Sequence, residues 1–204
     1  MTIRSQVRRL EELGVPNLAG ITVEKLHAYA RPLAEEPNAV LAVHPSLVPA
    51  HRLAPLLSRN DKPGFVVADM IDLDQFVDHE RYVTVPDRPL YLLTGVDRGD
   101  DMRNWSPDEA LPAIVHAARS PLTISEGICW LFQEPKALQP NYCFMTIGSR
   151  KRTKRGLDAR TPAIWISGGA GRDGTASAGA PKVGWCWAGN RHTWLGFAST
   201  GRRI

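Results

Sequence analysis

The chain has 204 residues, of which 43% are hydrophobic and 23% charged, and its formal net charge is +4. These values are typical of a globular protein and exclude a disordered or collagen-like chain, and the length suits a single domain, 1–204. Charges interrupt the first ten residues where an export signal needs an apolar stretch, and no apolar run reaches the roughly 18 residues of a membrane span, so we expect a cytoplasmic protein.

Charge is distributed unevenly along the chain. Residues 1–140 carry 14 Lys and Arg against 19 Asp and Glu, whereas residues 141–204 carry 11 against 2, so the two parts have net charges of −5 and +9. This asymmetry indicates a polyanion partner for the C-terminal third, because cations near phosphates gain Coulomb energy and release counterions. The alternative is that the two parts fold together and neutralise each other.

Helices are predicted in the first part of the chain. The apolar spacing in residues 3–10, followed by Gly14, predicts a short amphipathic helix. Thr22 can cap a second helix that ends before Pro32, and a strand is predicted near residues 40–43.

The central segments combine buried strands with an acidic stretch. Residues 65–68 and 89–94 are compact apolar runs that predict buried strands. The acidic residues 69–78 between them predict a helix with an exposed polar side.

Two helix starts are marked by capping sequences. Residues 106–109 (Ser-Pro-Asp-Glu) place a capping serine, a first-turn proline and a glutamate that reaches back to the cap amide, and this helix should run to about Arg119. Thr123 and Glu126 repeat the pattern before an apolar face, and this second helix should end near Pro135.

The last third is predicted to be rich in strands, at 142–147, 163–167, 183–187 and 193–197. Residues 168–181 are mostly Gly, Ala and Ser, a composition typical of a mobile loop. The fold class is therefore α+β, with N-terminal helices packed on a mostly antiparallel sheet formed largely by the C-terminal third.

The first function hypothesis is a non-enzymatic protein that contacts RNA or a ribonucleoprotein. No predicted helix carries the positive charge, which disfavours reading of the DNA major groove. The residues expected to contact nucleic acid are Arg150, Lys151, Arg152, Lys154, Arg155, Arg160 and Arg191. A solvated loop without a partner is the alternative for this segment. A protein partner on the acidic N-terminal part is a further alternative.

The second function hypothesis is a small-molecule enzyme or ligand-binding domain that uses an aromatic hairpin. The turn sequence Gly189-Asn190 aligns Trp187 with His192, and Trp185 with Trp194, so these four side chains should share one face. That face could stack on a planar ligand. The alternative is ordinary packing, because tryptophans bury large areas.

Metal and cofactor chemistry has little support, and no cofactor or metal is predicted. The neighbouring acids Asp69, Asp72 and Asp74 offer oxygen ligands, but such clusters are more often an exposed helix face. Zinc held by thiols and His192 lacks a CxxC pair, and in the predicted register Cys186 and His192 point to opposite faces.

Two catalytic loop motifs are also missing. Residues 167–174 are rich in glycine but lack the GK[ST] ending of a phosphate-binding loop. Ser120, Ser125 and Ser167 lie outside any GxSxG elbow, so a serine hydrolase has no anchor. The three cysteines, Cys129, Cys143 and Cys186, are expected to be reduced thiols.

Three stretches, LYLLTGVDRG (90–99), RSPLTISEGI (119–128) and KVGWCWAGNRHTWLGFAS (182–199), together resemble an actinobacterial domain family of unknown function. The resemblance covers the chain from about residue 65 to its end. It implies a bacterial cytoplasmic protein, and it carries no catalytic residue, ligand or activity.

Overall fold

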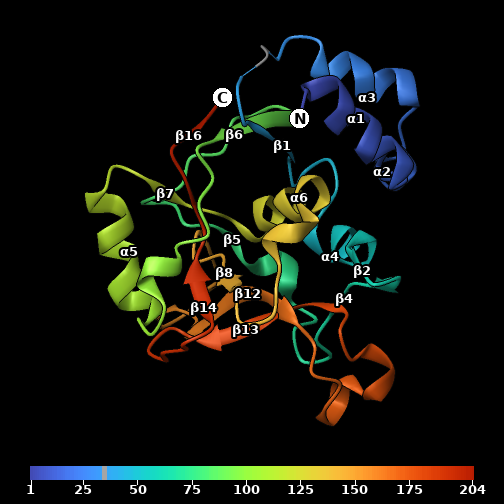
Figure 1. Ribbon diagram of the computed structural model, residues 1–204. Helices are drawn as coiled ribbons and strands as arrows, with labels where there is room; N and C mark the ends of the chain where they lie inside the picture. The colour runs from blue at the N-terminus through green and yellow to red at the C-terminus, as the bar shows by residue number, and fades with distance from the viewer. Residues whose placement is uncertain (34–35) are drawn as a thin grey trace.

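In the computed structural model, which describes residues 1–33 and 36–204, a buried ten-residue helix lies between two sheets (Figure 1). The α-helices of the described residues are α1 (Ile3–Glu12), α2 (Val15–Ala19), α3 (Val23–Ala30), α4 (Ala50–Leu53), α5 (Pro107–His116) and α6 (Ile124–Gln133). Short 3₁₀ turns are η1 (Ala54–Leu56), η2 (Leu73–Gln75), η3 (Asp100–Met102), η4 (Pro135–Ala137), η5 (Gly171–Asp173) and η6 (Thr175–Ser177).

The larger sheet has five strands, in the order β14 (Leu195–Phe197), β8 (Cys143–Met145), β12 (Arg160–Ile166), β13 (Pro181–Trp187) and β4 (Phe65–Val66). The smaller sheet has the order β1 (Val40–Val43), β6 (Leu90–Thr94) and β16 (Arg202–Arg203). Four two-stranded ladders complete the described strands: β2 (Ser58–Arg59) with β3 (Lys62–Pro63), β5 (Val77–Asp78) with β9 (Ser149–Arg150), β7 (Ser120–Pro121) with β15 (Ser199–Thr200), and β10 (Arg152–Thr153) with β11 (Gly156–Leu157). The pairings are antiparallel except for β13 with β4 and β14 with β8.

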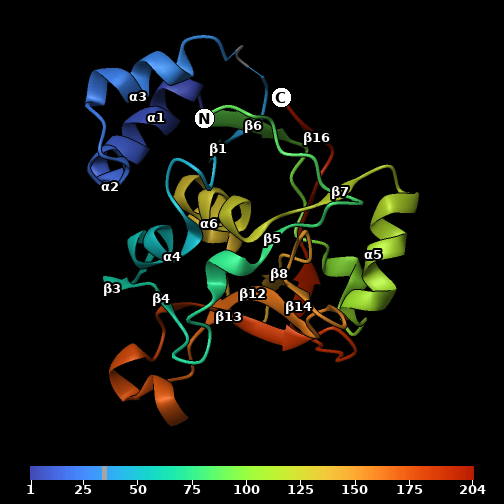
Figure 2. The same cartoon turned by 180° about the vertical axis from the view of Figure 1, so that it is seen from behind.

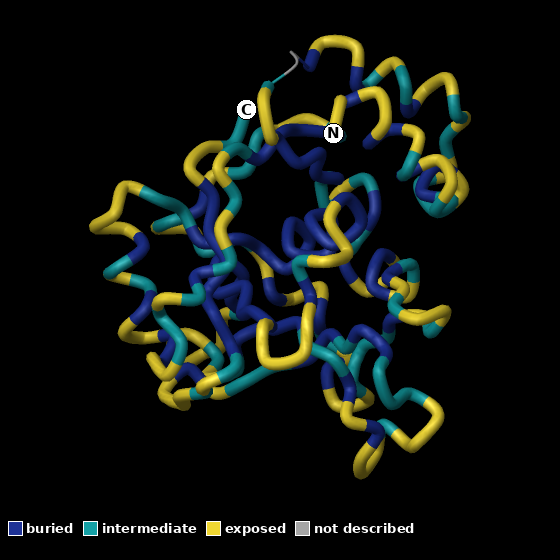
Figure 3. Tube along the Cα trace, viewed as in Figure 1, coloured by how far each residue is buried: buried dark blue, intermediate teal, exposed yellow. Residues whose placement is uncertain are grey.

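Helix α6 is the centre of the fold. It contacts β1 of the smaller sheet and β12 of the larger one, and the two views in Figures 1 and 2 place it between these layers. All ten of its residues are buried, which Figure 3 shows as a dark blue helix. Gly127 permits the close approach to the larger sheet, because a Cβ there would lie 2.6 Å from the Thr146 side chain. The buried hydrophobic residues on both sides of α6 form one contiguous core.

The predicted α+β class is confirmed, with helices at the N-terminus and strands concentrated toward the C-terminus. Both predicted capping boxes are present, at Ser106 and Thr123. In each, the cap hydroxyl accepts the backbone N–H of the glutamate three residues later, and the side chain of that glutamate accepts the backbone N–H of the cap residue. Helix α5 ends earlier than predicted, at His116, since Ala118 takes a left-handed conformation with φ of 55°.

The predicted helix over residues 69–78 is wrong. The segment contains only η2 and the short strand β5, with turns elsewhere. Its buried side chains are Met70, Leu73 and Phe76, and their spacing of three residues matches the period of a 3₁₀ turn rather than that of an α-helix.

The predicted pairing of 183–187 with 193–197 as a hairpin is also wrong. Strand β13 pairs with β12 on one side and β4 on the other, so neither edge is open to β14. The chain still turns at Gly189, where Asn190 N–H donates to the carbonyl of Trp187, and it then crosses to pair β14 with β8.

The Gly/Ala/Ser segment 168–181 forms a loop that contains η5 and η6, as the composition predicted. Two lysines attach the loop through three contacts: Lys62 donates to the carbonyls of Ala176 and Ala178, and Lys182 pairs with Asp173 at 2.6 Å. In the part of the chain that the structure describes, none of the helices has both the length and the apolar character needed to cross a membrane.

Candidate functional site

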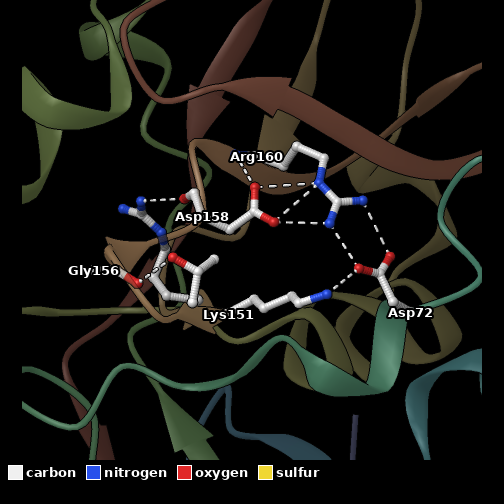
Figure 4. A network of polar contacts seen from close by, with 7 residues as sticks. Asp72, Lys151, Gly156, Asp158 and Arg160 are labelled. Atoms are coloured by element: carbon white, nitrogen blue, oxygen red, sulfur yellow. Dashed lines mark hydrogen bonds and ion pairs between the residues drawn. The ribbon is translucent and has the colours of Figure 1, made fainter.

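The basic segment, residues 150–160, folds back onto a carboxylate from the acidic first part of the chain. Lys151 Nζ lies 2.6 Å from Asp72 Oδ2, and Arg160 donates to both oxygens of Asp72, at 3.1 and 2.6 Å. Arg160 also pairs with Asp158 at 2.8 Å, and we call these four residues the Asp72 network (Figure 4). The hydrogen bonds from Arg160 lower the pKa of Asp72 to about 2, against an opposing effect of burial. The network therefore neutralises much of the segment's charge within the molecule.

The other predicted nucleic-acid contacts divide into bonded and open groups. Three are bonded inside the molecule: Arg150 to the carbonyl of Asp158, Arg152 to Glu80 and Arg191 to Glu109. Lys154 and Arg155 are exposed at the turn between β10 and β11, and within the described residues their side chains have no hydrogen-bond or ion-pair partner. Open positive charge is thus concentrated at this turn.

The four residues predicted to form one stacking face lie on two faces. Trp185 and Trp187 share one face of β13, with ring centroids 4.6 Å apart. Trp194 instead contacts Trp165, at 6.2 Å, and His192, at 5.4 Å. By the alternation along β12 and β13, Trp165 belongs to the opposite face from Trp185. An open hollow of about 410 Å³ lies beside Trp165 and Trp194.

The three acids considered as metal ligands do not converge. Asp72 belongs to the Asp72 network, Asp74 pairs with His51, and Asp69 is exposed. Within residues 1–33 and 36–204, no group of three His, Cys, Asp or Glu side chains is arranged to hold a metal ion.

The cysteines are separate free thiols. Cys143 on β8 and Cys186 on β13 are divided by β12. Burial raises the pKa of Cys129 to about 12 and that of Cys186 to about 11, so both remain protonated at neutral pH.

A cavity of about 430 Å³ opens at the N-terminal end of α6, and we call it the Ser125 cavity. Its walls are mostly apolar and come from segments far apart in sequence. The apolar lining residues are Pro45, Pro49, Ala50, Leu73, Phe76, Val77 and Ile124, and the polar ones are Asp74, Asp78, Thr123, Ser125 and Ser149. An apolar cavity with a few converging polar groups is the usual form of a small-molecule site.

Most of the polar groups at the start of α6 are already bonded. Thr123 Oγ1 accepts the N–H of Glu126 at 3.2 Å, and Glu126 Oε2 accepts the N–H of Thr123 at 2.7 Å. The N–H of Ile124 donates to Ser149 Oγ at 3.0 Å. Among the backbone N–H groups of residues 123–126, that of Ser125 has no hydrogen-bond partner within the described residues.

Ser125 presents two open hydrogen-bonding groups in this cavity. The residue is only 4% exposed, yet neither its hydroxyl nor its N–H has a partner within the described residues. A ligand that accepts hydrogen bonds can use both donors. The start of a helix also attracts negative charge, because its N–H groups and macrodipole point outward.

Asp78 supplies the opposite chemistry. It pairs with Ser149 in the β5–β9 ladder, and both residues line the cavity. Burial raises the pKa of Asp78, the charge of Glu126 raises it further, and Arg203 and His44 oppose the shift. A carboxyl group with a perturbed pKa in an apolar cavity marks a candidate functional group.

Glu126 lies directly behind the first turn and is fully bonded. It is 0% exposed and accepts hydrogen bonds from Tyr91 at 3.1 Å and from Arg203 at 2.6 and 2.8 Å. Arg203 comes from the C-terminal strand β16, so this ion pair attaches the end of the chain to the start of α6. The ion pair between Glu126 and Arg203 therefore has a structural role. The carboxyl group available to a ligand in the cavity is that of Asp78.

Asp74 stands at the edge of the same cavity and is paired with a histidine. The N–H of His51 donates to Asp74 Oδ1 at 3.2 Å, and His51 Nδ1 contacts Oδ2. This contact fixes the carboxylate of Asp74 against α4.

Sequence reasoning considered Ser125 only as a hydrolase nucleophile and missed its actual setting. The signal was present in the capping box, because a cap at Thr123 places Ser125 at the second helical position, where its N–H has no partner within the helix. Asp78 was assigned to an exposed helix face, and no local signal contradicted that assignment.

Residues 9–204 match the model of a protein family described as "Family of unknown function (DUF5701)". The match begins well before residue 65, where the resemblance seen in the sequence began. No curated protein and no solved structure matches the chain.

Proposed function

We propose that this chain, which belongs to a family of unknown function (DUF5701), binds a small apolar α-amino acid in the Ser125 cavity. The observation that carries the proposal is the pair of open donors on Ser125, located in the same apolar cavity as the carboxyl group of Asp78.

The ligand's carboxylate belongs at the start of α6. The N–H and hydroxyl of Ser125 are two open donors, and Ser149 adds a hydroxyl whose proton is free to turn to a ligand, because its oxygen accepts from Ile124. Carboxylates are favoured at helix N-termini by the same N–H groups and dipole that bind phosphate.

The ligand's ammonium group belongs beside Asp78. A carboxylate ligand alone would bring a third negative charge to a cavity that already contains Asp74 and Asp78. A ligand with an ammonium group next to its carboxylate removes this conflict, since the ammonium stabilises the ionised form of Asp78. The two polar ends of the site therefore favour a zwitterion.

The ligand's side chain belongs against the apolar wall. Leu73 and Phe76 of the segment around η2, with Pro45 and Pro49 before α4, offer an apolar surface. Burial of apolar area contributes roughly 25 cal/mol per Å² to binding. A branched aliphatic or aromatic amino acid suits this lining better than a polar one.

Calorimetric titration with L-leucine and L-phenylalanine tests the proposal. N-acetyl-L-leucine lacks the ammonium charge and L-leucinamide lacks the carboxylate, so each should bind at least about tenfold more weakly than L-leucine, a loss of about 1.4 kcal/mol. Absence of binding for both amino acids at millimolar concentration would overturn the proposal. Equal binding of N-acetyl-L-leucine would also overturn it, because the site would then be a simple anion site.

Two substitutions locate the ligand. Ser125→Ala and Asp78→Asn should each weaken binding of L-leucine about tenfold, which corresponds to one lost charge-assisted hydrogen bond. Ser58→Ala and Asp87→Asn are matched controls, since both residues are exposed and outside the cavity. Binding that survives both cavity substitutions unchanged would place the ligand elsewhere, including the hollow beside Trp165 and Trp194.

Polyanion binding by the basic segment is a second candidate function, supported by the exposed charges of Lys154 and Arg155. For either function, we propose a bacterial cytoplasmic setting. The three free cysteines are compatible with a reducing compartment.

A further inference from the structure

A second and larger cavity, of about 920 Å³ and widely open to solvent, lies at the opposite end of α6. We call it the Gln133 cavity. One wall is the loop that follows β6, residues 96–101, and the other is the last turn of α6 with η4. The residues that line it differ from those of the Ser125 cavity, so a ligand bound here is independent of the proposed function.

Gln133 provides a buried acceptor in this wall. The residue is 4% exposed, and its Nε2 donates to the carbonyl of Gln6 at 3.4 Å. Its Oε1 is buried and has no hydrogen-bond partner within the described residues. An unpartnered amide oxygen in a cavity wall calls for a donor, which a ligand can supply.

The end of the helix adds further acceptors. The carbonyl of Trp130 accepts the N–H of Glu134 at 2.7 Å, and the carbonyl of Glu134 accepts the N–H of Ala137 at 2.9 Å. Within the described residues, no backbone N–H is bonded to the carbonyl of Gln133, which also lines the cavity. The last carbonyls of a helix carry partial negative charge, which favours cations.

The rim of the cavity is acidic. Asp97, Asp101 and Glu134 line it and are exposed, and Asp97 Oδ1 is held by the N–H of Gly99 at 2.6 Å. Lys136 is the exposed cation among the lining residues.

Arg98 also lines the cavity, but its charge is already balanced. Its guanidinium pairs with both oxygens of Asp100, at 2.8 and 2.6 Å, and donates to the carbonyl of Ala137 at 2.8 Å. The bond to Ala137 joins the two walls. The remaining excess of carboxylates favours a positively charged ligand.

Trp130 contributes an aromatic surface to the same cavity. It is 6% exposed and is held against Phe144, with ring centroids 5.0 Å apart. Ammonium and guanidinium groups are attracted to the faces of tryptophan rings.

From the acceptors, the acidic rim and the aromatic wall together, we propose that the Gln133 cavity binds a small organic cation with several N–H donors, of the alkylguanidinium or primary alkylammonium class. The N–H donors bond to Gln133 Oε1 and the helix carbonyls. The positive charge is balanced by the rim carboxylates.

Calorimetric titration with agmatine and cadaverine tests this proposal, with choline as a cation that lacks N–H donors. Agmatine and cadaverine should bind at least about tenfold more tightly than choline. Their binding should weaken as salt is raised, because the rim charges are exposed. No binding of either amine at millimolar concentration, or equal binding of choline, overturns the proposal.

Substitutions at the rim avoid damage to the core. The double variant Asp101→Asn with Glu134→Gln should weaken agmatine binding at least about tenfold, whereas Asp87→Asn, an exposed acid outside the cavity, should leave it unchanged. Gln133→Leu should weaken it to a similar degree, with folding checked by circular dichroism. Unchanged binding in the double variant overturns the proposal even if Gln133→Leu fails to fold. Ser125→Ala should have no effect on agmatine, which separates this outcome from that of the amino-acid site.

Discussion

The Asp72 network and the Ser125 cavity differ in how far their polar groups are satisfied. Both assemble groups from distant parts of the chain, but in the network the carboxylates of Asp72 and Asp158 receive bonds from Lys151 and Arg160. In the cavity, the N–H and hydroxyl of Ser125 donate to no acceptor within the described residues. The high density of charge in the sequence identifies the region of the Asp72 network, whereas the Ser125 cavity is identified by hydrogen-bonding groups that the folded chain leaves without a partner. We therefore expect satisfied polar groups to control stability and open ones to control binding.

The largest effect on stability is expected at the buried ion pair behind the cavity. Arg203→Met leaves Glu126 buried without its cation, and breaking a buried pair in this way costs about 3–5 kcal/mol. Urea denaturation measures the change. Arg202→Met is the matched control, because Arg202 is exposed on the same strand. A loss below about 1 kcal/mol for Arg203→Met would contradict the structural role of the pair.

A smaller loss of stability is expected from the Asp72 network. Asp72→Asn removes the negative charge that Lys151 and Arg160 share and replaces one of its two acceptor oxygens with an NH₂ donor, so it should cost about 1–3 kcal/mol in urea denaturation. Asp69→Asn, at an exposed neighbouring acid, should cost far less. If the two variants are equally stable, the network is only a surface arrangement.

The same residue predicts an acid dependence. The pKa of Asp72 is lowered from 3.8 to about 2, so its contribution is complete above pH 3.8 and is lost as the pH falls toward about 2. Asp72→Asn should therefore flatten the fall in stability over this range, as measured by thermal unfolding.

A third prediction concerns the pH dependence of binding in the Ser125 cavity. Because the pKa of Asp78 is raised, its carboxyl group keeps its proton to a higher pH than an ordinary aspartate, and an ammonium ligand must displace that proton. Affinity for L-leucine should thus increase with pH, by at most about tenfold per unit, until Asp78 is fully ionised.

Glu126, Arg203 and His44 also act on Asp78, so the control must remove Asp78 alone. Asp78→Asn should abolish the proton release that calorimetry detects in buffers of different ionisation enthalpy. A pH profile that is identical in the wild type and in Asp78→Asn would show that this carboxyl group does not contact the ligand.

The smallest effect on stability is expected at the exposed basic turn. Replacing Lys154 and Arg155 with serine should change stability by no more than about 0.5 kcal/mol. If the segment contacts RNA, the double substitution should weaken poly(U) binding and reduce the salt slope by about 0.7 for each lost phosphate contact. Lys151→Ser with Arg152→Ser should reduce RNA binding less, because these cations are paired within the protein. No RNA affinity in the wild type at low salt would end the polyanion hypothesis.

The failed hairpin shows where local reasoning reaches its limit. The turn at Gly189 was correctly placed, and strand-forming runs flank it on both sides. The partner of β13, however, depends on which strands occupy its two edges, and β12 and β4 do so. A turn sequence determines the local backbone conformation, and it carries no information about which strands pair with the two edges of β13.

Local chemistry was enough to predict the helix caps at Ser106 and Thr123, the strand at 40–43 and the glycine-rich loop, because each depends on hydrogen bonds or apolar spacing within a few residues. The α+β class followed from the order of these elements. The charge pairing and both cavities were decided only in the tertiary structure. Asp72 lies 88 residues from Arg160, and the Ser125 cavity joins the segments 45–50, 73–78, 123–125 and 149. Whether a charge or a hydroxyl is satisfied depends on neighbours that packing brings from elsewhere in the chain, so a sequence shows which groups are available and only the folded chain shows which remain open.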